Sequence, residues 1–188
     1  MDVKIMTRKI YLIRHGETDL NKAKCFYGSL DVSINNTGKR QALSLKEAFL
    51  EINPNNIFIS GKKRTKETAD IVFPKQAKII EERFAEKGFG EWEGLDANAI
   101  EKSYPEEWQK WLDAPFDYTP PEAENFSDFK KRVLTAFQEM IETTTDNVVI
   151  ISHLGVIRTI VSYVSSIDDF WSINLEQDAW LELEIKTI

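Results

Sequence analysis

Two short apolar runs, each followed by a histidine, constrain the fold of this chain more than any other feature. Residues 10–13 (Ile-Tyr-Leu-Ile) and 148–151 (Val-Val-Ile-Ile) are continuously apolar, which predicts strands buried on both faces of a sheet. His15 and His153 follow these runs and are the two histidines of the chain. Because ligands bind at the C-terminal edge of open α/β sheets, we expect both imidazoles to have a functional role there.

The residues beside His15 suit phosphate chemistry. Arg14 offers a planar fork of donors that stays charged, and Gly16 lets the backbone turn sharply or approach a ligand closely. His15 itself can act as a base, an acid or a nucleophile. This pairing is a weak signal when it is taken alone.

A second cationic segment lies at the start of a predicted helix. Lys62, Lys63 and Arg64 stand where acidic residues are usual, at the positive end of the helix dipole. A strand-to-helix turn is a natural place for a bound anion. The pattern favours such a role for Arg64, whereas Lys63 and Lys66 are expected to be solvated surface residues.

The composition excludes several classes of function. The chain has 188 residues, of which 42% are hydrophobic and 29% charged, and this fits one domain with a substantial core. A net charge of −7 argues against a nucleic-acid surface, and it requires a local positive site for any anionic substrate. The single cysteine, Cys25, excludes an intramolecular disulfide. We expect a cytoplasmic protein with no membrane span and no signal peptide.

Alternating strand and helix patterns predict an α/β fold. Further short strands are expected at 57–59 and 78–80, and helices at 37–50, 62–73, 125–143 and 156–164. Thr37 is the expected N-cap of the first of these helices. Residues 97–113 are expected to form one or two helices, with a break near Pro105. The partial alternation of residues 171–188 predicts two terminal strands that form a hairpin at the sheet edge.

The sequence pattern does not decide the role of two segments. Phe26 and Tyr27 lie in an irregular stretch, where they either pin the loop to the core or form the wall of a pocket. Residues 81–94 contain three glycines and read as a loop. Their glutamates are either solvated or include a catalytic acid, and the pattern does not choose among them.

Four motifs together resemble the histidine phosphatase superfamily, which also contains the cofactor-dependent phosphoglycerate mutases. They are residues 14–18 (Arg-His-Gly-Glu-Thr) with Asn21, residues 60–69 with Arg64, Glu86 followed by residues 90–94 (Gly-Glu-Trp-Glu-Gly), and residues 152–158 (Ser-His-Leu-Gly-Val-Ile-Arg). The resemblance runs from about residue 10 to at least 164, and its nearest branch is similar to α-ribazole and broad-specificity phosphatases. The chain departs from the family pattern at residues 59–62, at Glu67 and at Leu154.

The resemblance implies both a fold and catalytic roles. The expected fold is one phosphoglycerate mutase-like domain over residues 1–188, a three-layer α/β/α sandwich with a mostly parallel mixed central sheet, in which residues 97–121 form a small helical cap-like insertion. His15 is implied to form a covalent phosphohistidine. Arg14, Arg64 and His153 would bind the phosphoryl oxygens, and Glu86 would protonate the leaving group and then activate water.

The substrate side of the site is implied less sharply. Asn21 would add a donor and Leu154 would narrow the pocket, while selectivity would come from Phe26, Tyr27, Trp92 and the segment 97–121. No metal and no cofactor are implied. The expected partner is a small phosphorylated metabolite, with α-ribazole 5′-phosphate as one candidate, and neither nucleic acid nor membrane is expected. The chain would act as a monomer or a homodimer.

Two other functions stay open. A cofactor-dependent phosphoglycerate mutase would share the His15 chemistry, but the mutases that the chain resembles carry a larger insertion between the positions of Glu86 and His153. A catalytically inactive phosphate-binding or scaffold protein would keep the motifs without turnover. The chain keeps all five residues for which a catalytic role is implied, and this argues against an inactive protein. They are Arg14, His15, Arg64, Glu86 and His153.

Overall fold

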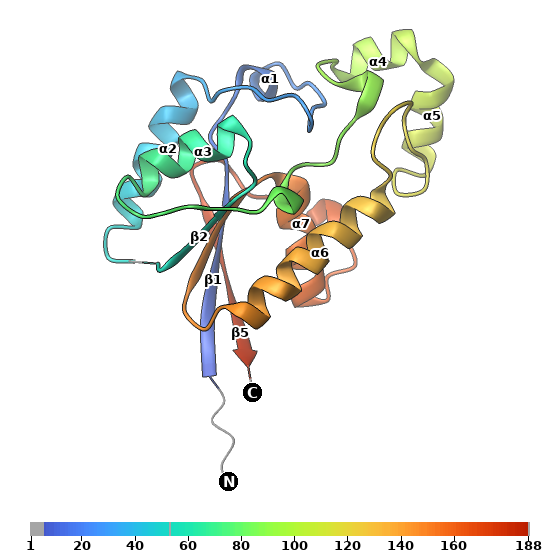
Figure 1. Ribbon diagram of the computed structural model, residues 1–188. Coiled ribbons are helices and arrows are strands. Elements are labelled where there is room, and N and C mark those ends of the chain that lie inside the picture. Colours follow the sequence, from blue (N-terminus) through green and yellow to red (C-terminus); the bar gives the residue numbers. More distant parts are fainter. Residues whose placement is uncertain (1–5, 53, 188) are drawn as a thin grey trace.

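A five-stranded sheet forms the centre of the computed structural model, which describes residues 6–52 and 54–187 (Figure 1). The strand order is β3-β2-β4-β1-β5. The bounds are Met6–Arg14 for β1, Asn56–Ile59 for β2, Ile79–Ile80 for β3, Val148–Ser152 for β4 and Trp180–Thr187 for β5. Neighbouring strands pair in parallel except β5, which runs antiparallel to β1.

The two apolar runs occupy the middle of this sheet, as predicted. Ile10, Leu12 and Ile13 of β1 are fully buried, and Val148 to Ile151 of β4 are fully buried as well. Burial on both faces is what a continuously apolar strand requires. Because β1 and β4 are parallel neighbours, the residues that follow them emerge at the same edge of the sheet.

Helices cover both faces of the sheet, which confirms the predicted α/β/α sandwich. On one face lie α2 (Asn36–Ala48) and α3 (Lys63–Val72), and on the other α6 (Phe126–Thr143) and α7 (Leu154–Ser165) (Figure 1). Odd residues of β1, such as Tyr11 and Ile13, face the first pair, and even residues face the second. Among the described residues, none of the helices is both long enough and apolar enough to cross a membrane.

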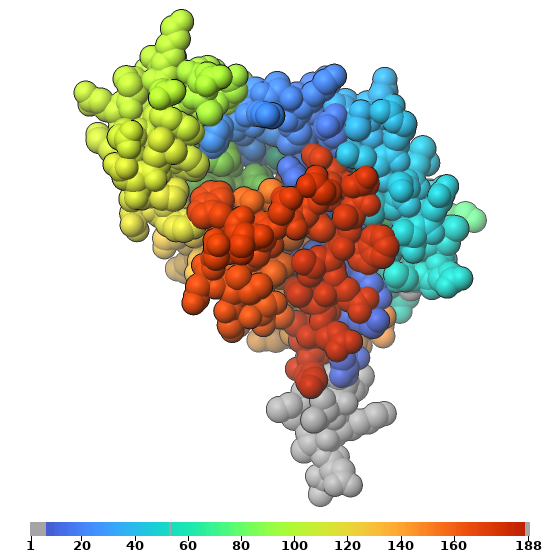
Figure 2. Space-filling view, turned by 180° about the vertical axis from the view of Figure 1, so that it is seen from behind, coloured from blue at the N-terminus to red at the C-terminus, as the bar shows by residue number. Residues whose placement is uncertain are grey.

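The remaining elements gather beyond the C-terminal ends of the parallel strands. They are α1 (Asp19–Lys22), α4 (Ala97–Ser103), α5 (Pro105–Asp113) and the 3₁₀ turns η1 (Glu82–Phe84), η2 (Gly90–Trp92) and η3 (Phe170–Ser172). Figure 2 shows the yellow-green segment that holds α4 and α5 beside the blue N-terminal segment, with a hollow between them.

Two local predictions were wrong. The C-terminal segment is not a hairpin, because residues 170–172 form η3, whose N-terminus is capped by Asp169, and β5 alone pairs with β1. The N-cap of α2 is Asn35 rather than Thr37, and the Asn35 side chain accepts a hydrogen bond from the Gly38 N–H at 2.9 Å. Both residue types favour this position, so the choice is made by tertiary contacts rather than by intrinsic preference.

One close backbone approach holds the segment after β1 against α2. A Cβ atom on Gly38 would lie 2.7 Å from the backbone nitrogen of Glu17 and 2.9 Å from the carbonyl carbon of Gly16. Backbone atoms cannot yield as a flexible side chain can. Glycine at position 38 therefore permits the loop that carries His15 to rest directly on the first turn of the helix.

We expect Gly38→Ala to destabilise the protein by about 1–3 kcal/mol, because the overpacking cost exceeds the gain of about 1 kcal/mol in helix propensity. Chemical denaturation measures the loss. Ser44→Ala, at an exposed position of the same helix, is the matched control and should leave stability unchanged or slightly raise it. Wild-type stability in Gly38→Ala would contradict the packing argument.

Candidate active site

The parallel pairing of β1 and β4 brings the two histidines together. Arg14 pairs with Ser152 in the register of the sheet, and the His15 N–H donates a hydrogen bond to the Ser152 carbonyl at 2.9 Å. The ring centroids of His15 and His153 are 5.1 Å apart. Both rings are buried, with relative exposures of 4% and 0%. The predicted meeting of these residues at one sheet edge is therefore what the structure shows.

The tautomer of His15 follows from its hydrogen bond. Nδ1 lies 2.8 Å from the Gly16 carbonyl oxygen, and since a carbonyl only accepts, Nδ1 carries the proton and Nε2 carries the lone pair. Burial, together with the charges of Arg64 and Arg14, lowers the pKa of His15 to about 3. At neutral pH the ring is therefore an uncharged imidazole with Nε2 free to react.

His153 is held in the opposite tautomer. Its Nδ1 accepts a hydrogen bond from Arg64 Nε at 3.3 Å, so a neutral ring carries its proton on Nε2, which lies 2.8 Å from Ser60 Oγ. Burial, and next the charge of Arg64, keep the pKa of His153 well below its ordinary value. Ser60, which follows β2, was not predicted to belong to the site. Ser60 follows a predicted strand, and this position at the same edge of the sheet could have indicated that it belongs to the site.

Arg64 is fully buried at the start of α3 and connects His153 to a loop. Its terminal nitrogens donate to the carbonyls of Leu30 and Gly28 at 2.7 and 2.9 Å. The guanidinium carbon lies 4.8 Å from the centroid of the Tyr27 ring. A fixed positive charge thus sits beside both imidazoles, where it opposes their protonation.

Arg14 reaches the site from the end of β1. It donates through Nη1 to the Leu175 carbonyl at 3.2 Å, while its buried Nε has no hydrogen-bond partner among the residues that the structure describes. Burial lowers the pKa of Arg14, but arginine remains charged at neutral pH. A half-buried guanidinium with unused donors at the cavity wall is suited to bind an anion.

Glu86 lies at the N-terminus of α7, close to His153. Its Oε2 accepts a hydrogen bond from the Gly155 N–H at 3.0 Å, and its Oε1 accepts from the Lys87 N–H at 3.0 Å. The α7 dipole favours a carboxylate at this position. Of the glutamates between residues 81 and 94, Glu86 is thus the one held beside the paired histidines.

Arg132 on α6 holds the backbone around Glu86, and sequence reasoning missed it. Its Nη1 donates to the carbonyls of Arg83 and Ala85 at 2.7 and 2.8 Å, and Nη2 donates to the Glu86 carbonyl at 3.2 Å. Glu124 completes the arrangement with a salt bridge to Arg132 Nε at 2.6 Å. Contacts between side chain and backbone over such sequence separations leave no periodic signal.

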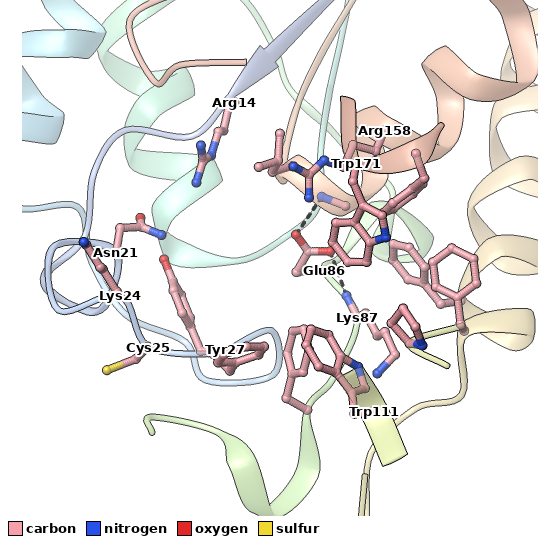
Figure 3. A pocket seen from close by; sticks show the side chains of 18 of the residues that line it. Arg14, Asn21, Lys24, Cys25, Tyr27, Glu86, Lys87, Trp111, Arg158 and Trp171 are labelled. Carbon is pink, nitrogen blue, oxygen red and sulfur yellow. Dashed lines mark hydrogen bonds between the residues drawn. The ribbon is translucent and has the colours of Figure 1, made fainter. Parts of the chain in front are cut away.

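A cavity of about 490 Å³ opens beside these residues (Figure 3). Six of the predicted site residues line it: Arg14, Asn21, Phe26, Tyr27, Glu86 and Leu154. His15, Arg64 and His153 are buried behind this lining. Asn21 Oδ1 accepts from the Thr18 N–H and from Gln177 Nε2, both at 3.1 Å, which leaves the amide nitrogen to donate toward the cavity.

Trp92 does not line the cavity, contrary to the prediction. It is fully buried one layer behind, where its ring packs against Phe26, Trp108 and Trp111 at centroid distances of 6.2, 5.7 and 6.1 Å. Phe26 and Trp111 themselves face the cavity. Trp92 therefore supports the wall between the N-terminal loop and α5 rather than forming it.

Several cavity residues were not predicted. They include Lys24, Lys87, Arg158, Trp171 and Gln177, whereas Trp111 and Phe116 belong to the segment 97–121 from which selectivity was expected. Arg158 follows Leu154 by four residues on α7, so the helical period could have indicated that both share a face. Trp171 belongs to η3, where sequence patterning wrongly predicted a strand.

Comparison with known proteins agrees with this geometry. The model of the histidine phosphatase superfamily (branch 1) matches residues 10–187. The chain belongs to this superfamily. As a branch 1 histidine phosphatase, it is a phosphatase by class, and its α/β/α fold is that of its structural neighbours.

Named relatives of this histidine phosphatase differ in substrate. Phosphoserine phosphatase 1 of Hydrogenobacter thermophilus is 27% identical over 177 residues, with 92% of this chain and 84% of the relative covered. The adenosylcobalamin/α-ribazole phosphatase of Salmonella typhimurium is 25% identical, with coverage of 94% and 90%. The crystal structure of the α-ribazole phosphatase from Shigella flexneri shares the fold at 23% identity, with a TM-score of 0.87 and coverage of 93% and 89%.

The lowered pKa of His15 predicts a pH dependence of stability. Between its ordinary pKa of 6.5 and about 3, the unfolded chain binds a proton that the folded protein excludes, so stability falls as the pH falls. Between pH 7 and pH 5, protonation of His15 in the unfolded chain lowers the free energy of unfolding by about 2 kcal/mol. The free energy of unfolding of His15→Gln should therefore fall by about 2 kcal/mol less than that of the wild type over this interval, as measured by urea denaturation at both pH values. Equal losses would contradict the assignment of a buried neutral imidazole.

Proposed function

We propose that this protein hydrolyses small phosphate monoesters through a phosphohistidine formed on His15. The observation that carries the proposal is the hydrogen bond from His15 Nδ1 to the Gly16 carbonyl at 2.8 Å, in a neutral ring between two arginines. It leaves the Nε2 lone pair for attack on phosphorus. Arg14 and Arg64 supply positive charge where the phosphoryl oxygens develop negative charge.

The first step is transfer of the phosphoryl group to the enzyme. His15 Nε2 forms a bond to phosphorus as the ester P–O bond breaks, and Glu86 in its acid form gives its proton to the departing oxygen. The arginines stabilise the charge on the phosphoryl oxygens, and His153 accepts the hydrogen bond that orients Arg64. The support for Glu86 is its place beside the α7 N-terminus, held by the Gly155 and Lys87 N–H groups.

The second step releases phosphate. Glu86, now a carboxylate, accepts a proton from a water molecule as its oxygen attacks phosphorus and the P–N bond breaks. Phosphate leaves, and His15 and Glu86 return to their starting forms. No other proton donor or acceptor is needed to balance the cycle.

The substrate class that we propose is a phosphorylated metabolite with an apolar or aromatic part. Phe26, Tyr27, Trp111 and Trp171 line the cavity together with further aromatic rings. Such walls suit a flat ring, because aromatic stacking adds about 0.5–1.5 kcal/mol beyond area burial. α-Ribazole 5′-phosphate, suggested by the Salmonella relative, has such a ring. We propose further that residues 97–121 act as a cap over this cavity, since Trp111, Pro115 and Phe116 line it.

Replacement of His15 tests the nucleophile. We expect His15→Ala to lower turnover of p-nitrophenyl phosphate by at least about 10³-fold while circular dichroism shows a folded protein. Wild type incubated with a ³²P-labelled ester and quenched in alkali should carry alkali-stable, acid-labile label, and His15→Ala should carry none. Retained turnover or retained label in the variant would overturn the mechanism.

Replacement of Glu86 tests the general acid. An alkoxide leaving group needs a proton and a nitrophenolate hardly does, so Glu86→Gln should slow alkyl phosphates by about 10²–10⁴-fold and p-nitrophenyl phosphate much less. Steady-state kinetics on both esters gives the comparison. Glu91→Gln, at an exposed position of the same segment, should leave both rates near wild type. Equal losses on the two esters in Glu86→Gln would assign the acid to another residue.

A further inference from the structure

Lys87 is a buried cation that the proposed mechanism does not use. It lines the same cavity as Glu86, yet its relative exposure is 8%. Figure 3 shows its side chain leaving the neighbourhood of Glu86 in the direction of Trp111. Lysine is almost never this buried unless it is paired.

The local contacts of the Lys87 ammonium do not satisfy it. The ammonium has three donors, and it lies 3.4 Å from the Gly88 carbonyl and 4.7 Å from the centroid of the Phe89 ring. Lys87 forms no salt bridge with a carboxylate in the described part of the chain. Burial lowers its pKa, which reflects the cost of holding the charge there.

Three carboxylates are near enough to raise the pKa of Lys87: Glu124, Glu86 and Glu93. Each of them is already hydrogen-bonded to another group. Glu124 is bound by Arg132 at 2.6 Å, and Glu86 accepts from two backbone N–H groups. Glu93 Oε1 accepts from the N–H groups of Gly28 and Phe89, both at 2.9 Å. Donors of Lys87 therefore stay available on the cavity side.

Arg158, the other unassigned cation near Glu86, belongs to the phosphate end of the cavity. The charges that act on Arg158 are those of Glu86 and Arg14. Its Nε donates to the Ile173 carbonyl at 2.8 Å, and its guanidinium carbon lies 5.2 Å from the Trp171 ring centroid. Lys24, the remaining cavity lysine, is exposed to solvent, so Lys87 is the buried cation placed to meet the leaving group that Glu86 protonates.

We propose that Lys87 forms an anion subsite for the leaving group, so that preferred substrates carry an acidic group, a carboxylate or a second phosphate, on the alcohol that is released. This inference rests on the proposed function. The net charge of −7 repels such doubly anionic esters, so their binding requires local cations at both ends of the cavity. Aromatic walls between the two ends would hold the ring or chain that joins the acidic groups.

The test compares esters that differ only in the charge of the leaving group. They are 4-carboxyphenyl phosphate, 4-phosphonophenyl phosphate and the neutral 4-carbamoylphenyl phosphate, with the 3-substituted isomers included to vary direction. We expect wild-type kcat/KM to favour an acidic ester over the neutral one by about 10- to 100-fold. If the carboxy ester has the larger ratio to the neutral ester, the subsite is one for a carboxylate; if the phosphono ester has the larger ratio, the subsite is one for a phosphate.

Variants then assign the preference to Lys87. In Lys87→Met and Lys87→Gln the ratio should fall toward one. Arg158→Gln should lower kcat/KM for acidic and neutral esters alike and keep the ratio, and Lys110→Gln, an exposed change of equal charge on α5, should also keep it. A wild-type ratio near one, or an unchanged ratio in both folded Lys87 variants, would overturn the subsite and leave the proposed function intact. Failure of the wild type to hydrolyse any of the esters would overturn both.

Discussion

The parallel pairing of β1 with β4 is the contact on which the site depends. It sets Arg14 opposite Ser152 and places the His15 and His153 rings 5.1 Å apart. A shift of one residue would turn every side chain of a strand to the other face, and here both faces are buried against helices. The same apolar residues that fix the register for packing therefore fix the geometry of the imidazoles.

Burial of the site then determines its charge states. Two histidines and one arginine share a water-poor region, and an uncompensated charge there is costly. The arrangement that satisfies this constraint keeps both imidazoles neutral and leaves Arg64 as the cation. Arg64 donates to His153 and to the Gly28 and Leu30 carbonyls. The loop at residues 28–30 is thereby tied to Arg64, whose charge adds to the effect of burial in lowering the pKa of His15.

The sequence could predict those parts of the structure that depend on residues close together in the chain. Buried strands, the residues at their ends and the unusual cation at position 64 follow from apolar runs and the helix dipole. Trp92, placed one layer behind the cavity, and Arg132, bonded to carbonyls about 46–49 residues away, follow from tertiary contacts that have no period. The wrong strand prediction near Trp171 has the same origin, because alternation in an aromatic segment does not distinguish a strand from a turn that packs against another loop.

The chemistry and the selectivity of this site arise from different layers of the molecule. His15, His153 and Arg64 are fixed by strand ends and a helix start next to the central sheet. The cavity walls come from segments that have no place in the sheet, including residues 26–27, 87–89, 111–116 and 170–177. The C-terminal segment joins the two layers, since Leu175 binds Arg14 and Gln177 orients Asn21. Because these wall segments lie outside the sheet, their residues can change without disturbing the β1–β4 register that holds the two imidazoles together.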